Sequence, residues 1–195
     1  GNMLACVTSF EYYSTGKLKS RKDAAGRSTV FEYDYDGRIK KKTDPMQNST
    51  TYTWDIQGNL IQEKNARGFT VSYDYDSMNR LIRKISPAAD GSNATIRYIY
   101  DVMGNLIKQI LPNDYVRELD TPELVNTMPG VSYAYDCMNR CTASLSPEGR
   151  ILEAFSYDAK GNITKKADGL RYTGSVESSP GTACIYDGLN RVTEV

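Results

Sequence analysis

Aromatic side chains recur in pairs, two residues apart, at the ends of short apolar stretches that turn residues separate. A period of two places side chains on one face of an extended strand, which predicts strands with one buried face and excludes helix. The first aromatic position holds Phe10, Phe31, Tyr52, Tyr73, Tyr98, Tyr133 and Phe155, and Cys184 is the exception. The second position holds Tyr12, Tyr33, Trp54, Tyr75, Tyr100, Tyr135, Tyr157 and Tyr186.

Each aromatic pair is followed by the same turn signal. The residue after the second aromatic is Asp34, Asp55, Asp76, Asp101, Asp136, Asp158 or Asp187, with Tyr13 as the exception. Three residues later stands Gly16, Gly37, Gly58, Asn79, Gly104, Asn139, Gly161 or Asn190. Gly and Asn accept a positive φ most cheaply, and a type I turn followed by a left-handed residue connects hairpin strands. Asp at the first corner accepts hydrogen bonds from the turn amides. Each copy therefore predicts a β-hairpin.

After the turn, a polar residue and then an aliphatic one begin the returning strand, which ends at a second turn such as Asp23 to Gly26 or Asn65 to Gly68. Eight copies predict about sixteen short strands in one array over residues 1–195. Two insertions interrupt it. Residues 111–130 contain Thr121 and Pro122, which are typical of a helix start, and a short helix is expected there. Residues 167–182 have no periodicity and predict a mobile loop.

Composition removes several classes of function. The chain has 24 basic and 24 acidic residues and no histidine. Without histidine there is no Ser-His-Asp or Cys-His machinery and no imidazole metal ligand. A neutral balance argues against nucleic acid, because phosphate binding needs an excess of Lys and Arg. No apolar run approaches the roughly 20 residues of a membrane span, and no signal peptide is visible.

The repeated motif resembles the Rhs, or YD, repeats. Its best copies are residues 75–81, 100–106 and 157–163, which begin with Tyr-Asp and end in Asn or Arg followed by Leu or Ile. Proteins of this family include bacterial surface and polymorphic-toxin proteins, insecticidal toxin complexes and teneurins. The resemblance implies an all-β fold, in which consecutive antiparallel hairpins form a curved, spiralling sheet. With about eight repeats, a partial shell is expected and closure is not.

The resemblance also implies a structural function: scaffold, encapsulation or surface presentation, outside the cell or at its surface. The partners would be adjacent repeats or domains of a longer chain. The family's C-terminal core segment, rich in Asp-Pro and Gly and associated with self-cleavage, has no counterpart here. The sequence stops within a repeat at Val195, so a piece of a larger protein is expected. No catalytic residue is carried over, and we expect neither an enzyme nor a cofactor.

Two ligand hypotheses remain beside the structural one. The aspartates would suit calcium, but each turn supplies one carboxylate where calcium takes six or more oxygens, so turn capping is the favoured explanation. The tyrosines outside the two aromatic columns could stack on a sugar, which gives the alternative function of binding carbohydrate or a cell-surface protein. The candidates are Tyr35, Tyr115 and Tyr172. Plentiful Asp and Glu keep glycoside cleavage formally open, without a motif for it.

The cysteines and the strand edges complete the expectations. Cys6, Cys141 and Cys184 continue apolar columns and are expected to be small buried hydrophobes, whereas Cys137 lies in a turn. Cys-x-x-x-Cys without histidine is a weak metal signal, and no metal site is predicted. Terminal strands of a hairpin array expose open edges, which predicts edge-mediated homo-oligomers.

Overall fold

The computed structural model describes residues 7–195, so Cys6 lies outside the described residues. It contains two compact units, Gly1–Ala94 and Thr95–Val195, with the boundary near the start of strand β9. Strands β1 to β15 follow one another in sheet order as they do along the chain, and every pair recorded between them is antiparallel. The predicted all-β array of consecutive hairpins is confirmed.

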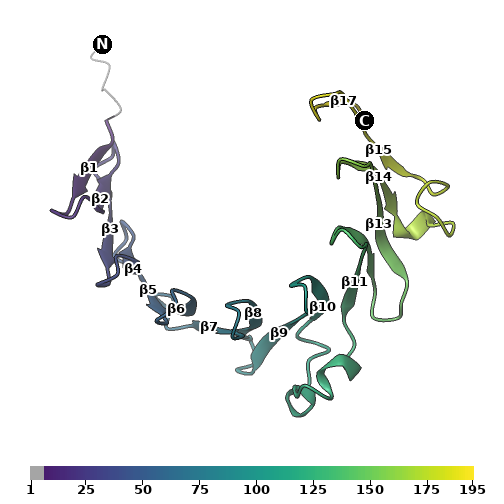
Figure 1. The fold of residues 1–195 in the computed structure, drawn as a ribbon. Coiled ribbons are helices and arrows are strands. Elements are labelled where there is room, and N and C mark those ends of the chain that lie inside the picture. The colour runs from purple at the N-terminus through teal and green to yellow at the C-terminus, as the bar shows by residue number, and fades with distance from the viewer. Residues whose placement is uncertain (1–6) are drawn as a thin grey trace. The chain divides into compact units, whose positions relative to one another are not determined.

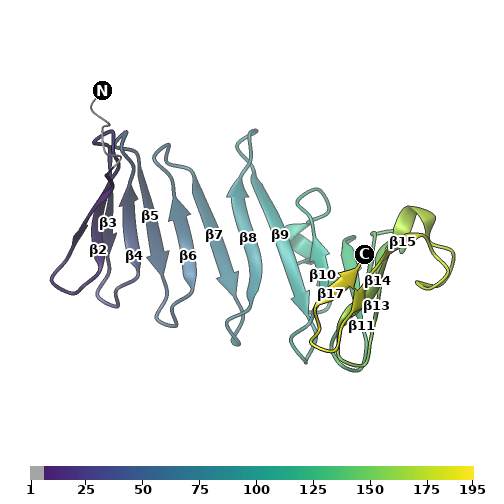
Figure 2. The same cartoon turned by 90° about the horizontal axis from the view of Figure 1, so that it is seen from above.

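In the first unit, Figure 2 shows the strands side by side with alternating directions. Seen nearly end-on in Figure 1, they form a single layer. The strands are β1 (Ser9–Tyr12), β2 (Leu18–Lys22), β3 (Ser28–Tyr33), β4 (Ile39–Thr43), β5 (Ser49–Trp54), β6 (Leu60–Lys64), β7 (Thr70–Tyr75) and β8 (Leu81–Pro87).

The second unit continues the hairpin pattern and adds three single 3-10 turns. Its strands are β9 (Asn93–Tyr100), β10 (Leu106–Ile110), β11 (Val131–Tyr135), β12 (Cys141–Leu145), β13 (Ile151–Tyr157), β14 (Ile163–Asp168), β15 (Gly181–Ala183), β16 (Ile185–Tyr186) and β17 (Val192–Glu194). The turns are η1 (Arg117–Leu119), η2 (Val125–Thr127) and η3 (Gly169–Arg171). Strands β16 and β17 pair only with each other in the described chain.

The hairpins share one register irregularity beside the turn. In the β3–β4 hairpin, Glu32 lies opposite Lys41 but Tyr33 lies opposite Ile39, so one residue of β4 is unpaired. The same shift precedes the second aromatic in the β1–β2, β5–β6, β7–β8, β11–β12 and β13–β14 hairpins. A bulge of this kind bends the bulged strand and increases its local twist.

The aromatic face, defined by the two aromatic columns, is half-buried. At the edge of the first unit Phe10 is 50% and Tyr12 60% exposed, whereas Tyr52 and Tyr73 within the sheet are intermediate. A single layer has no second layer to cover this face, so its side chains are shielded by neighbours along the sheet. They are inter-strand ladder residues, and the fully buried residues of the described chain lie elsewhere.

The buried cluster consists of Ile110, Val125 and Met128, against which Ile99, Tyr115 and Leu119 pack. Gln109 pairs with Tyr98 of the aromatic column, so the adjacent Ile110 points to the opposite face of the sheet. Val125 and Met128 come from the insertion after β10, whose turns are seen beside β10 in Figure 1. The insertion therefore builds the core of the second unit by folding over the face that bears no aromatic columns.

The expected helix at Thr121 is shorter and starts later than the sequence suggested. The Thr121 hydroxyl accepts a hydrogen bond from the Leu124 N–H at 3.3 Å, and the 3-10 turn η2 begins only at Val125. Two prolines, Pro122 and Pro129, bracket this segment and limit its length.

The second insertion is more regular than expected. Ala167 and Asp168 extend β14, and Gly181 with Thr182 belongs to β15. Between them, η3 is capped by the Asp168 carboxylate, which accepts from the Leu170 N–H at 3.0 Å. Hydroxyl groups organise the remainder, and Ser179, only 2% exposed, donates to the Ser175 carbonyl.

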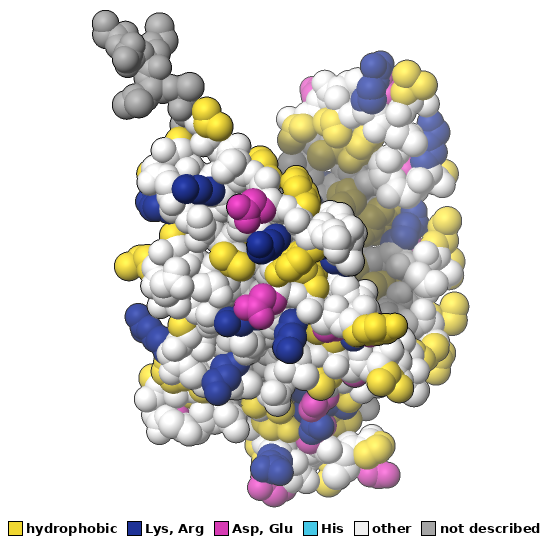
Figure 3. Space-filling model, turned by 90° about the vertical axis from the view of Figure 1, so that its left-hand side faces the viewer, with side chains coloured by type: hydrophobic (Ala, Val, Ile, Leu, Met, Phe, Trp, Pro, Cys, Tyr) yellow, Lys and Arg dark blue, Asp and Glu magenta, His cyan; other side chains and the backbone are white. Residues whose placement is uncertain are grey.

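Charged side chains of both signs are interspersed on the surface, as Figure 3 shows for one view. Cross-strand pairs such as Glu32–Lys41 at 3.3 Å and Asp74–Arg83 at 2.8 Å join neighbouring strands. In the described part of the chain, no helix has the length and apolar character that crossing a membrane would require.

Candidate functional site

The repeated turn is a five-residue unit, and we number its positions 1 to 5 from the Asp. In the turn Asp136 to Arg140, the Asp136 N–H donates to the Arg140 carbonyl and the Asn139 N–H donates to the Asp136 carbonyl, both at 3.0 Å. Oδ1 of Asp136 accepts from the backbone N–H of Met138 at 2.9 Å and of Arg140 at 3.0 Å, and Oδ2 accepts from the Arg140 guanidinium at 2.7 Å. Both carboxylate oxygens are thus bound within their own turn.

All eight turns share this backbone. Position 4 has a φ between 60° and 94° in every copy: Gly16, Gly37, Gly58, Asn79, Gly104, Asn139, Gly161 and Asn190. The first turn has Tyr13 at position 1 and keeps the backbone bonds without a carboxylate. In the other turns the position 1 aspartates accept from the position 5 backbone N–H: Asp34, Asp55, Asp76, Asp101, Asp136, Asp158 and Asp187.

The turns at the opposite ends of the strands use the same geometry. The sequence indicated their positions but not the role of their first residue. Asp23, Asp44 and Asn65 each accept from two turn amides, and Ser146 accepts from one through its hydroxyl. Their left-handed position is Gly in most copies but Gln47, with φ 65°, in one. The five-residue spacing was the signal that could have identified these turns as the same unit. It was harder to recognise because Gln47 occupies a left-handed position, where Gln is rare.

Hydrogen bonding lowers the pKa of the turn carboxyls. For Asp136 the main cause is the Arg140 backbone N–H, opposed by burial and reinforced by the Arg140 side chain. For Asp158 the Asn162 side chain contributes most, followed by its backbone N–H. At Asp76 burial alone would raise the pKa, but the bonds from Arg80 outweigh it. The carboxylates are therefore held ionised as hydrogen-bond acceptors.

We expect stability to fall in acid. A carboxyl whose folded pKa is depressed contributes stability above its unfolded pKa, near pH ~4, and loses it as pH falls through the folded value. The melting temperature should therefore decrease as pH is lowered from about 4 toward 2. Combining Asp136→Asn with Asp158→Asn should flatten this slope, because each change removes a carboxyl with lowered pKa. Parallel slopes for variant and parent would contradict the account.

In six hairpins, the side chain of the second aromatic column is hydrogen-bonded to the hairpin before it. The Tyr33 hydroxyl donates to the Leu18 carbonyl at 2.9 Å, and the Tyr75 hydroxyl to the Leu60 carbonyl at 3.0 Å. Trp54 uses its indole N–H for the Ile39 carbonyl at 2.8 Å. The same bond recurs from Tyr135 to Leu106, Tyr157 to Cys141 and Tyr186 to Ile163. Each accepting residue begins the returning strand of the preceding hairpin.

This hydrogen bond explains why the two aromatic columns differ in composition. The first aromatic column contains three Phe, whereas the second contains seven Tyr and one Trp and no Phe. In the second column the ring edge donates a hydrogen bond to a backbone carbonyl, and Tyr and Trp supply the polar hydrogen for it. The repeated tyrosine thus acts by packing and by hydrogen bonding.

We expect Tyr75→Phe to lower the free energy of unfolding by about 1 kcal/mol, the usual net worth of one intramolecular hydrogen bond. The ring remains and only the bond to the Leu60 carbonyl is lost. Urea denaturation measures the effect. Tyr35→Phe is the matched control, because Tyr35 is fully exposed and its change should stay within about 0.5 kcal/mol. Equal effects of the two variants would contradict the role given to the Tyr75 hydroxyl.

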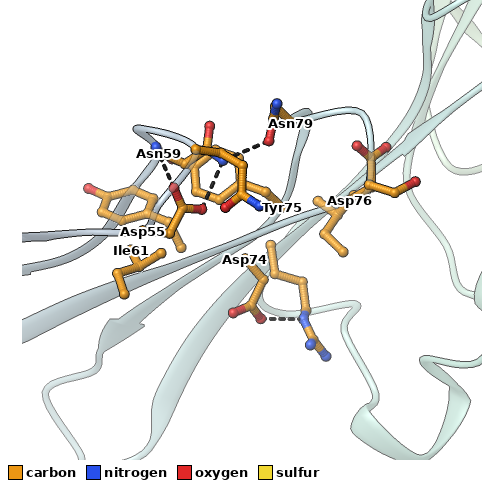
Figure 4. Close-up of a pocket in the computed structure, with 12 residues that line it drawn as sticks. Asp55, Asn59, Ile61, Asp74, Tyr75, Asp76 and Asn79 are labelled. Atoms are coloured by element: carbon orange, nitrogen blue, oxygen red, sulfur yellow. Dashed lines mark hydrogen bonds and ion pairs between the residues drawn. The ribbon is translucent and has the colours of Figure 1, made fainter.

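An open groove of about 580 Å³ lies between two hairpins of the first unit, near the turns at Asp55 and Asp76. Figure 4 shows Asn59 between Asp55 and Asn79, joined to both by hydrogen bonds. Asp74 also lines the groove but is paired with Arg83. Within residues 7–195, no cluster of three Cys, Asp or Glu side chains is arranged to hold a metal ion. The labelled Asp and Asn side chains Asp55, Asn59, Asn79 and Asp74 in this groove are thus already bonded to other side chains.

The three tyrosines proposed for ligand binding occupy different environments. Tyr35 is fully exposed at position 2 of a turn. Tyr115 packs against the buried cluster, and its hydroxyl donates to Asp120 at 2.9 Å. Tyr172 is half-buried at the end of η3. Tyr115 and Tyr172 thus belong to separate insertions, and only Tyr35 presents its whole ring to solvent.

The described cysteines are unpaired thiols. Cys141 and Cys184 are half-buried in or beside strands, and Cys137 is exposed in a turn. Burial raises the pKa of the Cys141 thiol, which keeps it protonated and unreactive.

Sequence comparison identifies the repeats in the first unit. The RHS Repeat family matches residues 12–45, 33–70 and 57–90. Comparison with curated proteins gives no match.

Solved structures share the fold at low sequence identity. The crystal structure of TcdB2-TccC3-Cdc42 matches 95% of this chain with a TM-score of 0.68 and 20% identity. The Tc holotoxin pore of Photorhabdus luminescens, with a substitution in TccC3, matches 96% with a TM-score of 0.66 and 19% identity. The chain spans about a tenth of the length of these structures' chains.

Proposed function

We propose that this chain is a non-catalytic structural segment of a larger RHS-repeat protein, with a role in scaffolding, encapsulation or surface presentation. One observation carries the proposal: the repeated polar residues are used within the sheet itself. The turn carboxylates bind their own turns, and the column tyrosines bind the preceding hairpin. A sequence whose repeated polar groups are hydrogen-bonded within the sheet is specialised for extending that sheet.

The fold comparison supports the same role. The similar structures are toxin-complex proteins, and TcdB2-TccC3 contains about ten times the length of this chain. By analogy, we infer that the partners of the segment are neighbouring repeats and other domains of its own long chain. Placement outside the cell or at its surface follows from the same analogy.

Electron cryomicroscopy of the full-length protein that carries this segment tests the proposal. We expect residues 7–195 to lie within a longer hairpin sheet, with further strands paired to the open edges of β1 and β17. The structural role would be overturned if residues 7–195 formed a separate domain that linkers join to the rest of the protein and whose edge strands β1 and β17 are unpaired. Turnover of polysaccharide substrates by the purified segment would overturn its non-catalytic part.

Carbohydrate or cell-surface binding is a second candidate, favoured by one groove. It measures about 410 Å³ and is lined by Tyr13, Tyr33 and Tyr35 together with Lys17 and Glu32. Aromatic rings beside charged side chains suit a sugar, whose faces are apolar and whose edges are polar. A glycan array with the parent and Tyr35→Ala separates the possibilities. Binding that Tyr35→Ala abolishes would support it, and no binding above background would end it.

A further inference from the structure

Position 5 of each turn and position 4 of the next turn follow a strict correspondence along the chain. An Asn at position 5 is followed by Asn at the next position 4, and a Lys or Arg is followed by Gly. The Asn pairs are Asn59 with Asn79, Asn105 with Asn139, and Asn162 with Asn190. The Lys or Arg pairs are Lys17 with Gly37, Arg38 with Gly58, Arg80 with Gly104, and Arg140 with Gly161. No pair breaks the rule in either direction.

Side-chain length explains the Asn pairs. Nδ2 of Asn59 donates to Oδ2 of Asp55 in its own turn and to Oδ1 of Asn79 in the next, both at 2.9 Å (Figure 4). Asn105 and Asn162 make the same two bonds, and their reach to the next turn is 3.0 and 3.2 Å. The position 5 Asn side chain is too short to reach the backbone of the next turn, and it is hydrogen-bonded instead to the position 4 Asn side chain of the next hairpin.

The Arg pairs reach the next turn without help. Arg38 binds Oδ2 of Asp34 through Nε at 2.7 Å and the Asp55 carbonyl through Nη1 at 2.9 Å. Arg140 repeats this with Asp136 and with the Asp158 carbonyl, again at 2.9 Å. The guanidinium thus spans both turns and contacts backbone, so the next position 4 needs no side chain.

Backbone strain then decides which residue stands at position 4. Glycine is the least strained residue at a left-handed φ, so Asn is expected only where its side chain is needed. A Cβ at Gly37 would collide with the end of the flexible Lys17 side chain, which would have to move, whereas one at Gly58 would lie 4.0 Å from Nη1 of Arg38, an ordinary van der Waals contact. Where a long residue at position 5 already contacts the backbone of the next turn, the left-handed φ therefore favours glycine at position 4.

We propose that positions 5 and 4 of successive turns form a two-residue matching rule that specifies which hairpin packs after which. The proposal rests on the structural function above and names the contact that gives hairpin stacking its specificity. The rule holds across the insertion between Asn105 and Asn139, which are 34 residues apart, so it follows neighbouring turns and not spacing in sequence. The contact surface is the row of repeated turns. Each turn in this row packs against the next hairpin, whose position 4 residue matches its own position 5 residue.

A double-mutant cycle on Asn59 and Asn79 tests the rule. Asn79→Gly removes the acceptor that meets Asn59, and Asn59→Arg places a long side chain opposite the Asn79 amide. The double variant Asn59→Arg/Asn79→Gly recreates the pair seen at Arg38 and Gly58. We expect it to melt about 2–4 °C higher than the sum of the two single effects predicts. Exchange of the Met78 and Arg80 amides, which bind Asp76, should slow in the double variant relative to Asn79→Gly.

The control pairs the same two changes at turns that do not touch. Asn139 meets Asn105, so Asn139→Gly combined with Asn59→Arg should show additive effects. Additivity in the matched cycle as well would overturn the rule. Neither outcome depends on whether the segment binds glycans or turns over a substrate, so failure of the rule and failure of the structural function are told apart.

Discussion

Asp120→Ala is expected to lower the free energy of unfolding of the second unit by about 3–5 kcal/mol, the usual cost of removing one partner of a buried ion pair. Oδ1 of Asp120 lies 2.8 Å from Nε of Arg97, and the two side chains are only 6% and 16% exposed. Oδ2 accepts from the Tyr115 hydroxyl. The substitution leaves the buried Arg97 charge without this partner. It also removes the ion pair that holds residues 111–130 against β9.

The measurement is denaturant unfolding combined with hydrogen exchange over residues 111–130. Asp74→Ala is the matched control, because the Asp74–Arg83 pair has the same 2.8 Å separation but side chains 39% and 35% exposed. Exposed pairs contribute up to about 1 kcal/mol, so this control should change little. If Asp120→Ala cost no more than Asp74→Ala, the insertion would not be held by the buried pair.

Ile110→Ala is expected to destabilise the second unit by about 2–5 kcal/mol through lost burial and the cavity left behind. Ile110 is fully buried and packs with Val125 and Met128, and it is among the largest fully buried side chains of the described residues. Thermal or urea unfolding measures the loss. Ile56→Ala is the control, since Ile56 is 94% exposed and its change should stay within about 0.5 kcal/mol.

A small effect of Ile110→Ala, similar to that of Ile56→Ala, would mean that the second unit does not depend on its insertion. Accumulation of a species with intact hairpins and an exchanging 111–130 segment would show instead that the insertion opens separately. The cluster account predicts a loss of stability in strands β9 and β10 as well, because Ile99 and Ile110 lie in those strands.

The hairpins could be predicted because their determinants are local. Asp136 and Asn139 close a turn within five residues, and the alternation of Phe31 and Tyr33 fixes the face of a strand without reference to distant segments. Eight copies of the motif reinforced each local inference. Antiparallel neighbours then follow, because short connections leave a strand little choice but to pair with the previous one.

The core could not be predicted because its contacts are remote and carry no period. Met128 reaches Ile110 through a segment whose conformation is set by two 3-10 turns and the Arg97–Asp120 pair, 23 residues apart in sequence. The roles of Tyr75 and Asn59 were also hidden, since each depends on which hairpin lies beside it. A signal existed in the columns: no Phe in the second aromatic position, and matched Asn residues in successive turns.

Amide hydrogen exchange across one turn tests the central claim, that the repeated aspartates serve the architecture. In the Asp136 turn the Met138 and Arg140 amides bind the carboxylate and the Asn139 amide binds the Asp136 carbonyl, whereas no such bond is recorded for the Cys137 amide. The account predicts slow exchange at residues 138 to 140 and fast exchange at Cys137. Uniformly fast exchange across the turn would contradict it.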